Sequence, residues 1–228
     1  MNNALRDLYQ SRIGDLFAAL NKLVNQYGLN NLSNPHLIKV PPAYEKSQVK
    51  LLIVGQQARE WGGYFNGQPT PQLVDNLMKV YETFELGKSV PSPFWQAAHE
   101  IYARVNPDGP AGGFVWTNVI KIDQDGQRPI PPVVEACLNT FGLLPEEIEI
   151  LKPDVVVFLT GPYYDADLQL LFPGVEFRSV CQDIPIHHLA QVVHPRLPDK
   201  SFRIYHPGYL RRSEQWHYVD KVVALART

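Results

Sequence analysis

The chain of 228 residues carries 21 basic and 23 acidic side chains, a formal net charge of −2, and 45% hydrophobic residues. This balance provides no global positive field, so any contact with nucleic acid has to come from a local patch. The length and apolar content are ample for one sizeable domain with its own core. Two cysteines, Cys137 and Cys181, are too few for a four-thiolate zinc site or for an iron–sulfur cluster held by this chain alone.

The N-terminal segment has apolar residues at helical spacing from residue 4 to residue 27, interrupted by Asp7 and Asp15. We therefore expect an amphipathic helix within residues 1–30 that packs on the domain, rather than a targeting segment. The densest apolar run, residues 155–159, is far too short to span a membrane. Together with the low cysteine content, this favours a cytoplasmic protein with no membrane partner.

Short apolar runs bounded by turn residues predict four strands, at residues 50–54, 114–117, 154–159 and 202–205. Helical patterns cover residues 71–84, 93–105, 131–151, 163–171 and 211 to the end. Strands that alternate with helices predict an α/β fold in three layers, α/β/α, with a short, mostly parallel four-stranded sheet. We expect residues 1–228 to form a single domain.

Polar side chains follow three of the predicted strands. Gln57 comes shortly after the first, Asn118 directly after the second, and His206 directly after the fourth. Because ligands bind outside the carboxyl ends of parallel strands, these three side chains are expected to converge on one rim of the sheet.

The same segments carry a resemblance to a known family. The first strand runs into Gly55-Gln-Gln-Ala-Arg-Glu60, and the second ends in Phe114-Val-Trp-Thr-Asn118. The segment from Pro91 to Tyr102 contains the start of a predicted helix, the third strand leads to Gly161, and the fourth is followed by His206-Pro-Gly-Tyr-Leu210. In order and spacing, roughly residues 45–228 resemble the uracil-DNA glycosylase superfamily as a divergent member.

The resemblance implies hydrolysis of the N-glycosidic bond of uracil or another deaminated base in DNA. Base excision requires a flipped base, a stabilised leaving anion and a placed water molecule. By resemblance, His206 stabilises the anion, Asn118 recognises the base together with Gln56, and Gln57 positions the water. Asn118 offers one acceptor and two donors, which match the edge of uracil and mismatch cytosine.

The first motif departs from the family pattern. Gln57 stands where the best-known branch has aspartate, and an amide cannot accept a proton at neutral pH. A missing general base costs on the order of 10²- to 10⁴-fold in rate. Either the enzyme is slow, or a carboxylate such as Glu60 substitutes, or catalysis is lost. Arg59 replaces the tyrosine that excludes the thymine methyl group, so strict selectivity for uracil is not expected.

Further residues are assigned to DNA contacts by the same resemblance. Phe65 is the favoured stacking aromatic, with Trp61 and Tyr64 as alternatives. Leu210 matches the wedge that enters the vacated duplex space. The expected phosphate contacts are Arg211 and Arg212.

The resemblance implies no cofactor. The four histidines at positions 187, 188, 194 and 206 do not follow a known zinc spacing, so no metal site is expected. The expected partner is single- or double-stranded DNA with a damaged base, bound by a monomer. Two alternatives stay open: an inactive member that binds nucleic acid or a small ligand in the same pocket, and a hydrolase of another small substrate.

Overall fold

A computed structural model describes residues 1–227, and within them one sheet contains six strands in the order β2-β1-β3-β6-β5-β4. The strands are β1 (Leu51–Gln57), β2 (Phe114–Ile120), β3 (Val155–Phe158), β4 (Glu176–Ser179), β5 (Leu189–Val193) and β6 (Lys200–Ile204). Strands β2, β1, β3 and β6 are parallel to one another, whereas β5 and β4 are antiparallel to their neighbours.

The expected central sheet and alternating helices are present, but the expectation of a four-stranded sheet was wrong. The four predicted strands form a parallel part, and β4 and β5 add two antiparallel strands. Strand β4 lies at the edge, is largely exposed, and carries Glu176 and Arg178. An exposed edge strand needs no apolar run, so the sequence pattern gave no sign of it.

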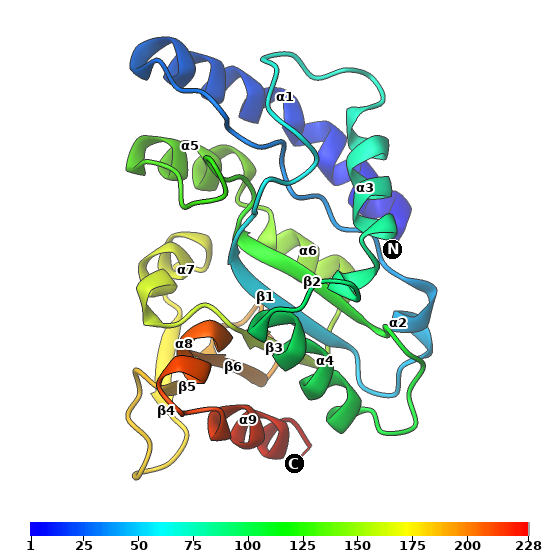
Figure 1. Cartoon of the computed structure of the whole chain (residues 1–228), viewed down its shortest axis with the longest axis vertical. Helices are drawn as coiled ribbons and strands as arrows, with labels where there is room; N and C mark the ends of the chain where they lie inside the picture. Colours follow the sequence, from blue (N-terminus) through cyan, green and yellow to red (C-terminus); the bar gives the residue numbers. More distant parts are fainter. Residues whose placement is uncertain (228) are drawn as a thin grey trace.

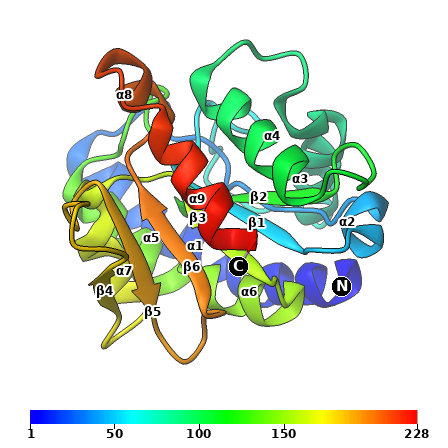
Figure 2. The same cartoon turned by 90° about the horizontal axis from the view of Figure 1, so that it is seen from below.

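Helices cover both faces of the sheet (Figures 1 and 2). The helices are α1 (Asn2–Tyr27), α2 (Pro42–Lys46), α3 (Leu73–Thr83), α4 (Pro93–Val105), α5 (Pro131–Phe141), α6 (Leu144–Leu151), α7 (Asp165–Leu171), α8 (Pro207–Arg212) and α9 (His217–Arg227), with short 3-10 turns η1 (Glu85–Gly87) and η2 (Pro162–Tyr164). Helices α5 and α6 pack on one face, with α1 outside them, while α4, α8 and α9 lie together on the other. Among residues 1–227, none of these helices combines the length and apolar character needed to cross a membrane.

Two of the predicted helices are interrupted. The segment 131–151 is divided at Gly142, where an added Cβ would lie 2.3 Å from the carbonyl oxygen of Leu138, so the chain turns too tightly for a side chain. The segment from residue 211 onward contains the end of α8 and the whole of α9, separated by a turn. Pro207 provides the first residue of α8, an early-helix position that proline favours.

Strand β2 is fixed from two directions. On its buried face, Glu147 of α6 accepts hydrogen bonds from Lys121 (2.6 and 2.7 Å), Thr117 (2.9 Å) and the Tyr9 hydroxyl of α1 (2.8 Å). At its open edge, the Tyr81 hydroxyl of α3 bonds both the backbone N–H and the carbonyl of Trp116 at 2.9 Å. A strand held at both its face and its edge is a rigid support for the side chains it presents on the opposite face.

Candidate active site

A cavity of about 550 Å³ opens where β1 and β2 approach their carboxyl ends. Its floor is formed by Gly55 and Asn118, which are register partners in the sheet. An added Cβ at Gly55 would lie 2.3 Å from Asn118 Oδ1, so the Asn118 side chain lies across Gly55 in space that only glycine leaves open. Both strands extend further than the sequence predicted, and Asn118 therefore lies within β2 rather than after it.

Three buried N–H donors around this cavity lack partners. Asn118 Nδ2, Trp116 Nε1 and Trp61 Nε1 belong to residues that line the cavity, and no described residue accepts a hydrogen bond from them. Buried polar groups in proteins are nearly always bonded, and an unsatisfied one costs about 1–3 kcal/mol. Three unpartnered donors on residues that line one cavity therefore favour a ligand that carries acceptor atoms.

His206 lies on the wall of the same cavity, as the N-terminal cap of α8. Its Nδ1 accepts a hydrogen bond from the backbone N–H of Gly208 at 3.1 Å, which leaves the ring proton on Nε2. Burial, and then the positive charge of Arg212, lower the pKa of His206. At neutral pH the imidazole is therefore uncharged, and its free group is a single N–H donor.

Gln57 also lines the cavity, but its side-chain oxygen is already engaged. The Tyr164 hydroxyl donates a hydrogen bond to Gln57 Oε1, and burial raises the pKa of Tyr164, which keeps that proton in place. Arg128 lies over the Tyr164 ring, 4.7 Å from its centroid, and forms a bidentate pair with Asp167 at 2.9 Å. This chain of contacts orients the Gln57 amide and leaves its oxygen one further lone pair.

Gln56, unlike Gln57, bonds the backbone of a neighbouring segment. Its Nε2 donates a hydrogen bond to the carbonyl oxygen of Thr160 at 2.8 Å, which ties the end of β1 to the segment after β3. The residue borders the cavity, but this bond occupies one of its two amide hydrogens.

Within residues 1–227, no aspartate or glutamate lines this cavity. Glu60 lies at the margin, because its Oε1 is 3.6 Å from the position that a Cβ on Gly126 would take, and Gly126 is a lining residue. Arg59 contributes a positive charge to the lining.

Aromatic rings form much of the wall. Phe94, at the start of α4, lies nearly parallel to the ring of His206, with 5.9 Å between ring centroids and 21° between planes. Phe65, the aromatic favoured by sequence, packs on Phe17 of α1 with 4.7 Å between ring centroids. Of the two alternatives, Trp61 lines the cavity, whereas Tyr64 is exposed and does not line it. The geometry thus makes Phe94, not Phe65, the ring beside His206.

The residues after His206 are divided between core and surface. Leu210 is fully buried, because its position in α8 directs the side chain into the core, so this structure does not present it at the surface as the expected wedge. Arg211 and Arg212 are exposed. Arg211 bonds Gln96 of α4 and lies over the Trp216 ring, 4.5 Å from its centroid. It lines a groove that adjoins the 550 Å³ cavity, called the main cavity below.

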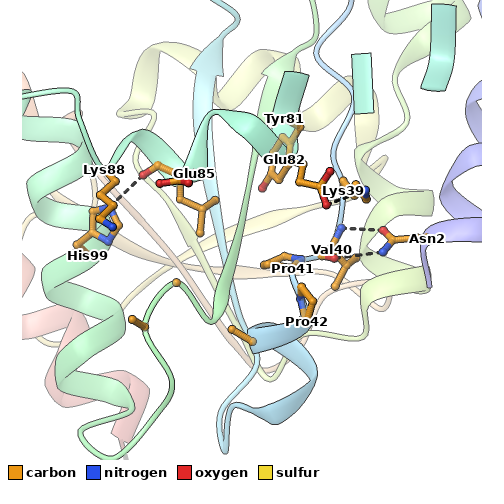
Figure 3. Close-up of a pocket in the computed structure, with 14 residues that line it drawn as sticks. Asn2, Lys39, Val40, Pro41, Pro42, Tyr81, Glu82, Glu85, Lys88 and His99 are labelled. Carbon is orange, nitrogen blue, oxygen red and sulfur yellow. Dashed lines mark hydrogen bonds and ion pairs between the residues drawn. The ribbon is translucent and has the colours of Figure 1, made fainter. Parts of the chain in front are cut away.

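A larger cavity of about 670 Å³ lies elsewhere, near the N-terminus of the chain and η1 (Figure 3). Several of its polar side chains are already engaged, with one another or with the backbone. Lys39 pairs with Glu82 at 2.9 Å, His99 Nε2 bonds the carbonyl of Leu86 at 3.0 Å, and Asn2 bonds both backbone groups of Val40. None of the residues that the sequence marked lines this cavity.

Sequence reasoning overlooked Trp116, Phe94 and Tyr164. Trp116 had a signal, because it lies two residues before Asn118 and strand residues two apart share a face. Phe94 and Tyr164 had none, since their places depend on how α4 and η2 pack against the strand ends.

An α/β sheet with a cavity near the carboxyl ends of its parallel strands, lined by aromatic rings and a few polar side chains, is typical of a protein that binds a small group or a nucleobase there. The family model described as the uracil DNA glycosylase superfamily matches residues 41–226, and the chain belongs to that superfamily. The search among curated proteins yields no match.

Proposed function

We propose that this protein hydrolyses the N-glycosidic bond of uracil or another deaminated base in DNA. The observation that carries the proposal is the set of unpartnered donors on Asn118, Trp116 and Trp61. Deamination replaces an exocyclic amine, which donates, with a carbonyl oxygen, which accepts. A cavity rich in buried donors therefore favours a deaminated base over its normal parent.

The chemistry of His206 agrees with this assignment. Cleavage of the N-glycosidic bond leaves negative charge on the departing base, and donors already in place stabilise such charge without reorganisation. The neutral imidazole with its proton on Nε2 offers such a donor. Superfamily membership supports DNA as the source of the base.

Water would be held near the sugar carbon by Gln57 rather than deprotonated by it. Its oxygen has one free lone pair and no affinity for a proton at neutral pH. We therefore propose slow turnover, with Glu60, at the margin of the cavity, as a carboxylate that could assist.

A second candidate function is supported by the missing carboxylate: a member that binds deaminated bases without excising them. The deciding experiment is a single-turnover assay on oligonucleotides that contain uracil, hypoxanthine or xanthine, followed by alkaline cleavage of abasic sites. His206→Ala and Asn118→Ala are the test variants, and Gly14→Ala, in open space on α1, is the matched control. Release that both test variants abolish supports the glycosylase; binding of the modified base without release supports the second candidate.

A further inference from the structure

Three tyrosines form a cluster next to the main cavity, made of Tyr163, Tyr205 and Tyr209. Tyr205 directly precedes His206, and its ring centroid lies 4.4 Å from that of Tyr209 in α8, with 32° between the planes. Tyr163 belongs to η2, and Gly161, which caps η2, lies against Tyr205, since a Cβ added at Gly161 would be 3.2 Å from Tyr205 Cδ1. Burial, followed by the nearby Tyr209 and Tyr163, raises the pKa of Tyr205, in keeping with a compact group.

The outer rings of this tyrosine cluster are exposed. Tyr163 is 83% exposed and Tyr209 is 38% exposed, while Tyr205 is half-buried between them and the core. Packing of the core does not require aromatic rings at such positions, and rings that face solvent beside a cavity are a common feature of ligand surfaces.

Positive charge accompanies the rings. Tyr209 and Arg212 are three residues apart in α8 and therefore lie on the same face of that helix, whereas Leu210 is directed into the core. Arg212 is close enough to lower the pKa of His206 through its charge. An anionic strand that passes over α8 would meet both the ring and the guanidinium.

We propose that the tyrosine cluster is a stacking platform for unpaired nucleotides that flank the target base. The proposal rests on the proposed function, because it takes the cavity as the place of that base. Aromatic rings beside a positive charge are how proteins hold single strands, whose base faces are free, whereas bases in a duplex are covered by their neighbours. The substrate class that follows is a single-stranded or locally unpaired DNA, rather than an intact duplex.

The test is fluorescence anisotropy with the intact protein and a labelled uracil-containing 15-mer, single-stranded and as a duplex, at low and at moderate salt. The variants are Tyr209→Ala, Tyr163→Ala and Tyr209→Phe. Tyr27→Ala is the matched control, because Tyr27 is 47% exposed at the far end of α1. Circular dichroism checks that each variant is folded.

Each alanine variant of the cluster is expected to raise the Kd for the single strand about five- to 150-fold, the range for loss of one stacked base. Tyr209→Phe and Tyr27→Ala are expected to leave it unchanged. The proposal is overturned if the wild type fails to bind the single strand, if it binds the duplex more tightly, or if the cluster variants and Tyr27→Ala behave alike. The excision assay is separate: His206→Ala is expected to lose excision and keep single-strand binding, so the platform and the glycosylase fail independently.

Discussion

The substitution Gly55→Ala tests the floor of the cavity with a single methyl group. The added Cβ would be 2.3 Å from Asn118 Oδ1, 3.2 Å from Trp116 Nε1 and 3.3 Å from Phe94 Cε2. Ordinary contact begins at 3.4 Å, so the Asn118 amide has to move by about 1 Å. Gly55 has no positive φ, and the effect therefore comes from this contact rather than from backbone strain.

A displacement of about 1 Å in a group that positions substrate lowers rates on the order of 10²-fold. Overpacking of the floor is also expected to reduce the free energy of unfolding by about 1–3 kcal/mol. Single-turnover release of the base measures the first quantity, and thermal unfolding the second. The dissociation constant for a uracil-containing strand is measured alongside, so that a slow wild type still gives a readable result.

Two outcomes would refute the reasoning. One is a folded Gly55→Ala protein that binds and excises like the wild type. The other is a loss of equal size when Gly55→Ala is added to Asn118→Ala, because an effect transmitted through the Asn118 amide has to disappear when that amide is gone. Gly14→Ala, which meets nothing within 4 Å in α1, should instead stabilise the protein by about 0.5–1 kcal/mol.

Three further predictions follow from the site and its support. Gln57→Asp supplies a proton acceptor but shortens the side chain, and single-turnover excision should rise up to roughly 10²-fold; no gain on any deaminated base would place the deficit in base recognition. NMR titration should give His206 a pKa below 6.5, and Arg212→Gln should raise that pKa. Because the folded protein holds this imidazole neutral, its contribution to stability is present above pH 6.5 and is lost as the pH falls through the pKa of His206 in the folded state. Glu147→Ala leaves the Lys121 ammonium buried and unpaired and should lower the free energy of unfolding by about 3–5 kcal/mol, whereas Lys121→Met with Glu147→Leu should cost less in a denaturant titration.

Three of the four parallel strands, β1, β2 and β3, were predictable because their first residues form short, continuous apolar runs, the pattern of strands buried on both faces. Strand β5 escaped notice because Gln191 interrupts a short run that follows two histidines. The place of Gln57, Asn118 and His206 on one cavity follows from parallel strand direction alone, and the structure brings the three together.

Side-chain direction was the part that the sequence could not provide. Leu210 has the chain position of a wedge, but whether it faces solvent depends on where α8 begins and which face packs. Phe65 follows the first motif at a plausible spacing, yet α1 supplies Phe17 as its partner and draws it away from the cavity. Both outcomes depend on tertiary packing, which no local pattern encodes.

Helix α1 lies before residue 41, where the superfamily match begins, and yet it is part of the same folded body. Its apolar face is buried, with Leu5, Leu16 and Leu20 fully covered, and its Tyr9 hydroxyl reaches the carboxylate that neutralises Lys121 beneath β2. A fragment trimmed to the matched residues would uncover an apolar strip on α5 and remove one donor from that carboxylate. The strand that carries Asn118 is thus supported by a helix outside the matched residues. A stable fragment of this protein has to include α1 from its first turn.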